Sequence, residues 1–255
     1  MNTTGFGCLK FVTHRLLSAL LVVTAVVGCG KQEQFKSEGN QTLESGGPEQ
    51  TPAVNPAPPS EANPNLPMSP LLWESNNVAA KKWSEFVFSL FKTELNDTLN
   101  AADDMVRFCP QYNKLIDSQK INVWGMLISA MSKYESNFLP TSRMKETTMG
   151  TDPVTGLPVY SEGLLQLSYQ DITGWSFCRF DWNKDKNLAP NDPKKTILDP
   201  YINLECGTKI LSEQVARHHK IVIDHGAYWA VIKENGKYQK INQIAALVQT
   251  LKFCK

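Results

Sequence analysis

Residues 117–140, DSQKINVWGMLISAMSKYESNFLP, combine an apolar helical pattern with one acidic residue near its end. Steps of three and four residues give a continuous apolar stripe, made of Trp124, Leu127, Ile128 and Met131. Glu135 is the next position on this stripe, whereas Ser129 and Lys133 fall off it and indicate a solvent side. The pattern predicts a core helix over 117–135 that ends with a carboxyl group on its apolar face.

A carboxyl group in this position has two interpretations. Desolvation raises the pKa of a carboxyl group, so Glu135 would stay protonated near neutral pH, as a general acid must. Alternatively, Glu135 emerges at the helix end as an ordinary acid, or a buried partner neutralises it. The stripe alone leaves both interpretations open.

The rest of residues 71–255 is long enough for one globular domain and is mainly helical in pattern. Further helices are expected at 75–97, 99–108, 163–175, 199–220, 225–232 and 241–253. Residues 139–160 are rich in proline and glycine, and 151–160 are compatible with a small β-hairpin. We therefore expect a mainly α domain with a small β-hairpin or loop insertion close to Glu135.

The N-terminal region has the composition of a leader and a tether. Its apolar run LLSALLVVTAVV (16–27) is too short for a membrane span and leads into Gly28 and Cys29, which resembles a bacterial lipobox. We expect a signal peptide over 1–28, a lipid on Cys29 and a Pro/Ser/Gly-rich tether over 29–70 that spans about 35 Å. A plain secretory signal or an uncleaved anchor is the alternative. No Asp follows Cys29 as an inner-membrane retention signal, so we expect an exported lipoprotein in the outer membrane, facing the periplasm.

Charge argues against one class of partner. The chain has 26 Lys and Arg residues against 25 Asp and Glu residues, a net charge of +1, and it contains no basic block. Binding to nucleic acid requires a concentration of positive charge. We expect no nucleic-acid partner, and we expect a monomer.

Four cysteines lie beyond the leader and the lipobox: Cys109, Cys178, Cys206 and Cys254. An even number in an exported protein predicts disulfides, and four cysteines allow three pairings. We favour Cys178–Cys206, which brackets an irregular loop, and Cys109–Cys254, which pins the C-terminus. A zinc site is the alternative, but no CxxC or HxxxH spacing supports it, so we expect neither a metal nor a cofactor.

Four short motifs in a fixed order resemble those of the soluble lytic transglycosylases and goose-type lysozymes. They are YESNFLP (134–140), GLLQLS (163–168), NLECGTKIL (203–211) and AYW (227–229). The resemblance covers roughly residues 117–232 and implies a lysozyme-like helical domain with Glu135 as the catalytic acid. It also implies that Tyr228 hydrogen-bonds and orients Glu135.

The resemblance further implies a set of substrate-binding residues: Ser136, Gly163, Leu164, Leu165, Gln166 and Tyr228. A glycine lets the backbone approach a sugar closely, and a glutamine amide offers hydrogen-bond donors and an acceptor to it. Asn203 and Gly207 are assigned structural roles, with Asn203 bracing the loop below. The chain departs from the family pattern at Trp229, where the family has Asn, and in the long insertion at 141–161.

The implied reaction is cleavage of the β-1,4 bond between N-acetylmuramic acid and N-acetylglucosamine in peptidoglycan glycan strands. In a lytic transglycosylase, Glu135 acts as both acid and base, and the C6 hydroxyl closes a 1,6-anhydro ring. In a lysozyme, water attacks, and an inverting enzyme needs a second carboxylate. Glu162 is our first candidate for it, followed by Glu146, Asp152 and Asp171. The motifs slightly favour the transglycosylase, and a non-catalytic peptidoglycan-binding envelope lipoprotein is the alternative of another class.

Overall fold

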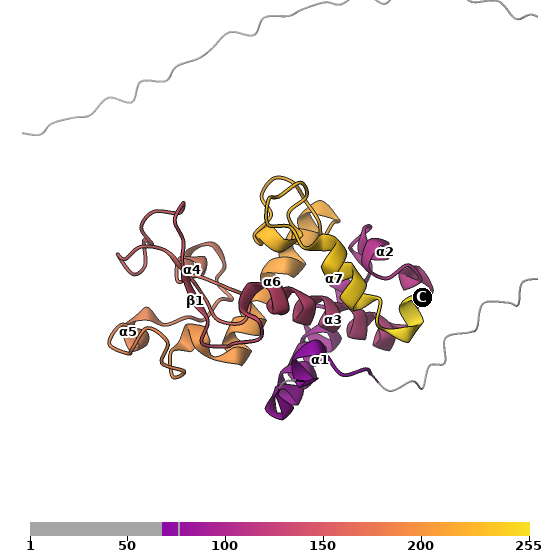
Figure 1. Cartoon of the computed structure of the whole chain (residues 1–255), viewed down its shortest axis with the longest axis horizontal. Helices are drawn as coiled ribbons and strands as arrows, with labels where there is room; N and C mark the ends of the chain where they lie inside the picture. Colours follow the sequence, from indigo (N-terminus) through magenta and orange to yellow (C-terminus); the bar gives the residue numbers. More distant parts are fainter. Residues whose placement is uncertain (1–67, 76) are drawn as a thin grey trace, which may run out of the picture. The chain divides into compact units, whose positions relative to one another are not determined.

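The structure, a computed structural model, describes residues 68–75 and 77–255 (Figure 1). The signal peptide, the lipidated Cys29 and nearly all of the tether lie outside the described residues, so their assignments stay predictions. Within the described ranges, no helix is long and apolar enough to cross a membrane.

The domain is mainly helical, with one two-stranded antiparallel sheet among the described residues, as the sequence predicted. The α-helices are α1 (Lys81–Thr93), α2 (Met105–Phe108), α3 (Asp117–Ser136), α4 (Asp171–Gly174), α5 (Trp182–Asp185), α6 (Pro200–His218) and α7 (Ile241–Val248). The strands are β1 (Arg143–Lys145) and β2 (Tyr160–Glu162). Short 3-10 helices lie at Leu72–Ser75, Val78–Ala80, Asn96–Asn100, Tyr112–Lys114, Thr196–Leu198, Ala230–Ile232 and Lys252–Cys254. The sheet, α4 and α5 lie at one end of the domain, and α2 and α7 lie at the other (Figure 1).

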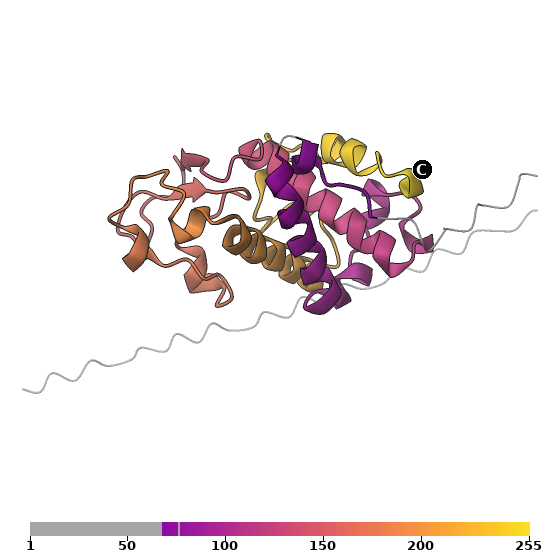
Figure 2. The same cartoon turned by 90° about the horizontal axis from the view of Figure 1, so that it is seen from below.

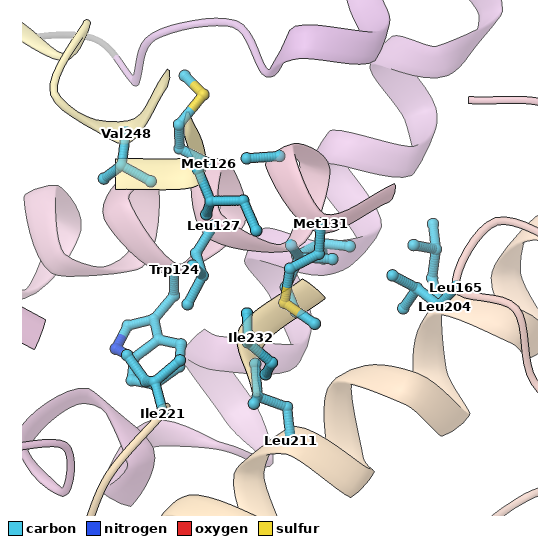
Figure 3. Packing of buried hydrophobic residues seen from close by; sticks show 14 of the residues in the cluster. Trp124, Met126, Leu127, Met131, Leu165, Leu204, Leu211, Ile221, Ile232 and Val248 are labelled. Carbon is cyan, nitrogen blue, oxygen red and sulfur yellow. The ribbon is translucent and has the colours of Figure 1, made fainter. Parts of the chain in front are cut away.

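Helix α3 is the centre of the core. It contacts α1 and α7, and Figure 2 shows α1 crossing it. At Gly125 the two helices come so close that a β-carbon would lie 2.6 Å from the Phe88 ring. Figure 3 shows Met131 of α3 in the same apolar cluster as Leu211 of α6 and Ile232. Because neighbours pack against it on several sides, α3 has less of a solvent face than its sequence suggests.

Two sequence expectations about α3 have different outcomes. The apolar stripe is fully buried, as predicted. Ser129, which we assigned to a solvent side, is buried as well, and its hydroxyl donates to the carbonyl of Met126 at 3.0 Å. A small hydroxyl side chain satisfied by its own helix can be buried at little cost, so its polarity did not reveal its environment.

Two local predictions of secondary structure were wrong, and the expected hairpin is present with different bounds. Residues 163–175 form a loop with only the short α4, because Gly163 and Gln166 both have positive φ, at 82° and 50°. Residues 225–232 contain only a 3-10 turn. The hairpin pairs Arg143–Lys145 with Tyr160–Glu162, whereas 151–160 contributes a single bridge between Thr151 and Pro158.

Both favoured disulfides are present. Cys109–Cys254 joins the end of α2 to the C-terminal 3-10 turn across a sequence separation of 145 residues. Cys178–Cys206 joins the loop after α4 to α6 across 28 residues. The second bridge fixes the irregular loop against the helix that supports the candidate site.

Candidate functional site

Glu135 occupies the last turn of α3. The helix stops directly after it, because Asn137 and Phe138 take left-handed backbone conformations with φ of 50° and 65°. Burial and, to a smaller extent, the negative charge of Glu146 raise the pKa of Glu135 from 4.5 to about 8. The Oε1 atom is buried and has no hydrogen-bond partner in the described part of the chain. Glu135 is therefore protonated at neutral pH and has an oxygen left free for a ligand.

Glu146 is the carboxylate whose charge acts on Glu135. It follows β1 directly, and its backbone N–H donates to the carbonyl of Val159 at 3.0 Å. Its Oε1 accepts the Ser161 hydroxyl of β2 at 2.5 Å. The hairpin thus holds a second carboxylate close enough to Glu135 to influence its protonation.

Tyr228 makes a different hydrogen bond from the one the motif resemblance implies. Its hydroxyl donates to Oδ2 of Asp171 at 2.5 Å instead of bonding Glu135. The pKa of Tyr228 is well above 10 because of burial, the adjacent Asp171 and the charges of Glu135 and Glu146. Tyr228 therefore belongs to the same electrostatic cluster as both glutamates, but Asp171 holds its hydroxyl hydrogen.

Asp171 is itself a buried acid with a perturbed pKa. Burial raises its pKa from 3.8 to about 6, although hydrogen bonds from Tyr228 and the Ser168 backbone oppose the rise. The Ser168 N–H lies 2.7 Å from the same Oδ2 atom that accepts Tyr228. The site thus contains two acids with raised pKa values, on α3 and α4.

Several residues that we assigned to the substrate are instead part of the packing. Leu164 and Leu165 are fully buried. Ser136 is buried too, and its hydroxyl donates to the carbonyl of Leu164 at 2.9 Å, which ties the end of α3 to this loop. The Gln166 amide donates to the carbonyl of Gly163 at 2.9 Å. Because these side chains are buried, they determine the shape of the loop. Ser136, Leu164 and Leu165 are not exposed where a sugar could contact them directly.

Gly163 is required by Asn203. A β-carbon at Gly163 would lie 2.2 Å from the Asn203 amide nitrogen, and the glycine has a φ of 82°. Asn203 is fully buried, donates to the carbonyls of Glu162 and Ile197, and accepts the Leu165 N–H at 2.9 Å. Asn203 thus ties together the loop around Gly163, and close packing against Asn203 accounts for the glycine at position 163.

Helix α6 and Trp229 complete the support of this loop. A β-carbon at Gly207 would lie 2.5 Å from Leu165, so a glycine at this position lets α6 pack closely against the loop. Trp229 is buried, and its Nε1–H donates to the carbonyl of Leu165 at 2.8 Å. A tryptophan at this position, where the family has Asn, therefore braces the loop.

Glu162, our first candidate for a second carboxylate, is engaged elsewhere. It is 2% exposed, and its Oε2 lies 2.6 Å from Nζ of Lys195 and 3.4 Å from Nε of Arg143. A buried carboxylate paired with two cations is poorly suited to activate water. Among the other candidates, Glu146 is the carboxylate whose charge acts on Glu135. The sequence did not rank Glu146 first because it lies in the insertion and belongs to no motif.

Searches with the whole chain found no matching protein-family profile and no matching curated protein. Among solved structures, the chain is similar to Bd0314 DslA, a Bdellovibrio protein. The wild-type form 2 is 29% identical with a TM-score of 0.61, and the match covers 74% of this chain and all (100%) of that one. Two variants match similarly, each with a glutamate replaced by glutamine, at position 143 (28% identity, TM-score 0.61, covering 74% and 100%) and at position 154 (28%, 0.60, covering 72% and 97%) of that protein.

Proposed function

We propose that the domain cleaves peptidoglycan glycan strands at the β-1,4 bond between N-acetylmuramic acid and N-acetylglucosamine, with Glu135 as the general acid. The observation that carries the proposal is the buried Oε1 of Glu135, which has no partner in the described part of the chain, and the raised pKa of this carboxyl, about 8, agrees with it. Burying a polar group without a partner destabilises a fold, and such groups concentrate at functional sites. Protonating a glycosidic oxygen requires such an acid.

We further propose that Glu146 is the second carboxylate. Two acids in different surroundings can divide the acid and base roles, and Glu146 accepts the Ser161 hydroxyl while Oε1 of Glu135 is buried without a partner in the described part of the chain. The spacing supports this pair. Glu146 lies 11 residues after Glu135 (146 − 135), and the two glutamates replaced in the DslA variants are also 11 residues apart (154 − 143).

The presence of Glu146 favours hydrolysis over transglycosylation. Glu135 gives its proton to the leaving oxygen, which breaks the glycosidic bond. A water molecule then adds its oxygen to the anomeric carbon, and Glu146 takes the proton of that water. In the alternative, the C6 hydroxyl of the muramic residue attacks, and its proton returns to Glu135.

Tyr228 has a defined part in this scheme. Its single hydroxyl hydrogen is donated to Asp171, so the hydroxyl oxygen can only accept further hydrogen bonds. A protonated carboxyl has one hydrogen to donate, and Tyr228 lies close enough to Glu135 for the ionised form of that carboxyl to raise the tyrosine pKa. Tyr228 would therefore favour the protonated form of Glu135, and Asp171 would orient Tyr228.

The setting that we propose for the reaction follows from the sequence. Export, lipidation at Cys29 and a tether would place a monomeric domain within reach of peptidoglycan while it stays attached to the outer membrane. Labelling cells with a radioactive or clickable fatty acid tests the anchor, because the label should be lost in Cys29→Ala.

Digestion of purified peptidoglycan in ¹⁸O-labelled water tests the reaction. Hydrolysis should give muropeptides with reducing ends that carry one ¹⁸O atom, detected by mass spectrometry. Products lighter by one water, without label, would show ring closure and transglycosylation instead. Binding without any released product would identify a non-catalytic peptidoglycan-binding protein and refute the proposal.

A further inference from the structure

A small cavity lies on the opposite side of the hairpin from Glu146. It has a volume of about 160 Å³, and its lining residues come mainly from the hairpin and from the segment that contains α5. Its walls include three aromatic side chains and three cations: Tyr160, Tyr169, Trp182, Arg143, Lys186 and Lys195. Nothing in the proposed reaction uses this cavity.

The register of the hairpin separates the cavity from the two glutamates. Side chains alternate between the faces of a strand, and Arg143 is paired with Glu162. These two residues and Tyr160 therefore share one face, which lines the cavity. Ser161, which binds Glu146, is on the other face. A ligand in the cavity would contact the back of the strand pair that holds the second carboxylate.

The acidic side chains of the cavity already accept hydrogen bonds within the protein. Asp152 accepts three backbone N–H groups and the Ser168 hydroxyl. Asp185 accepts the hydroxyls of Tyr169 and Thr196. These carboxylates are satisfied, so they offer little to a ligand that donates hydrogen bonds.

The cations of the cavity retain donor capacity. The Arg143 guanidinium stacks on Tyr160, with its Cζ atom 3.2 Å from the ring centroid. Its buried Nε makes no hydrogen bond within the described ranges, although it lies 3.4 Å from Glu162. Lys195 donates two hydrogen bonds, to Glu162 and to the carbonyl of Pro190, and an ammonium group has three hydrogens. The unsatisfied groups of the cavity are therefore donors on cations, which suits an anion.

Size and wall chemistry narrow the class of ligand. An apolar cavity of about 150 Å³ holds one benzene molecule, whereas pockets for larger ligands measure roughly 300–1,000 Å³. The cavity is thus large enough for one amino-acid-sized group and too small for a disaccharide. A guanidinium held flat against an aromatic ring presents its edge, which matches the geometry of a carboxylate.

We propose that this cavity binds the C-terminal carboxylate of a short peptide, such as the stem peptides attached to muramic acid. The link to stem peptides rests on the proposed cleavage of glycan strands, whereas binding of a carboxylate does not. The consequence for that reaction is a preference for strands that carry peptides over bare strands. Arg143 would be the specificity-determining residue.

A binding experiment tests the cavity without any need for turnover. The probe is the dipeptide N-acetyl-alanyl-alanine, with its C-terminal amide as the matched control, titrated into the full chain and followed by NMR of arginine Nε–H groups. We expect the acid to bind at least tenfold more tightly than the amide and to shift the Arg143 signal. Lys145→Gln removes a charge from the same strand without altering the cavity lining and should bind as the wild type does. Arg143→Gln should lose binding.

Three results would overturn the proposal. They are equal binding of acid and amide, no binding of the acid at about 20 mM, which is weaker than the millimolar end of the affinity scale, and retained binding in Arg143→Gln. Arg143→Lys keeps a positive charge beside Glu162 and provides the test if Arg143→Gln does not fold. It loses the planar fork, so we expect it to bind the acid several-fold more weakly than the wild type.

A second experiment compares peptidoglycan strands that carry peptides with strands from which an amidase has removed them. The measured quantity is the ratio of kcat/KM for the two substrates. We expect Arg143→Gln to lower this ratio about tenfold and Lys145→Gln to keep it. If neither strand is cleaved by the wild type, the proposed function fails, and the dipeptide titration still decides whether the cavity binds a carboxylate. If both are cleaved and Arg143→Gln keeps the ratio, the role in substrate choice fails and the proposed function stands.

Discussion

The raised pKa of Glu135 makes a prediction about stability that does not depend on catalysis. A pKa that is raised from 4.5 to about 8 on folding means that the folded state takes up a proton at neutral pH. The cost to folding is about 3 kcal/mol at pH 7, from about 1.4 kcal/mol for each pH unit above the unfolded value. Glu135→Gln removes this ionisation and should increase the free energy of unfolding by a similar amount.

The sign and the pH range of the effect follow from the direction of the shift. The pKa of Glu135 is higher in the folded state than in the unfolded state. Below pH 4.5 the carboxyl is protonated in both states, so its burial costs no ionisation energy, and the wild type loses stability as pH rises from 4.5 towards about 8. The difference in stability between Glu135→Gln and the wild type should therefore grow by about 3 kcal/mol between pH 5 and pH 8.

Urea denaturation at pH 5, 6, 7 and 8, followed by tryptophan fluorescence, measures this difference. The comparison cancels the titration of all other groups, because both proteins contain them. A glutamine that packs better or worse than the acid changes the difference by a constant and leaves its slope with pH unaffected. A difference that stays constant over this range would refute the raised pKa and, with it, the argument that Glu135 is protonated at neutral pH.

Three other substitutions test the surroundings of the site. Asp171→Asn keeps the shape of the side chain but removes the charge that holds the Tyr228 hydroxyl. In the wild type we expect the rate of glycan cleavage to rise as Asp171 ionises near pH 6, and this rise should be absent in the variant. An unchanged pH–rate profile would contradict this. Gly163→Ala should destabilise the domain by about 3 kcal/mol because of the clash, whereas Gly156→Ala, with a similar φ but open space, should cost about 1 kcal/mol; equal losses of stability in urea would rule out the clash. Replacing the Cys178–Cys206 disulfide with two serines should lower the free energy of unfolding by about 3–4 kcal/mol, measured in the same way, and a loss below 1 kcal/mol would be inconsistent with a native crosslink over 28 residues.

The position of Glu135 was predictable because two local patterns agree on it. The apolar stripe of 117–135 placed an acid against the core, and the motifs downstream singled out the same residue. Helix periodicity is a local property of the chain, so it predicted α3 well. Asn203 and Gly207 were singled out by the motif resemblance alone, because their contacts join positions that are far apart in the chain.

The helical prediction for 163–175 failed because the cause of the loop lies elsewhere in the chain. The sequence GLLQLS has apolar residues at helical spacing, but Asn203 approaches Gly163 and supplies the hydrogen bonds that hold the backbone in its turn. Burial of Leu164 and Leu165 under α6 follows from the same contact. A contact between residues 40 positions apart (203 − 163) has no local pattern in the sequence.

The surroundings of the candidate second carboxylates could not be predicted for a related reason. Glu162 stands next to the GLLQ motif, which made it the first candidate in the sequence. The register of the hairpin turns Glu162 towards Lys195, and it brings Ser161 to Glu146. The alternation of side chains along β2 places Ser161 and Glu162 on opposite faces of the hairpin. The turn residues alone, however, did not show where in the long insertion the hairpin lies.

The central claim is that Glu135 supplies the proton that breaks the glycosidic bond. The most direct measurement compares the initial rates at which the wild type, Glu135→Gln and the neighbouring control Lys133→Gln release soluble muropeptides from purified peptidoglycan at pH 6. Without its general acid, the Gln variant should lose a factor of about 10³ or more, because proton transfer by a positioned acid contributes roughly 10²–10⁴-fold; the control should stay within about twofold of the wild type. A rate for Glu135→Gln within tenfold of the wild type, with the fold shown intact by its urea transition, would contradict the account.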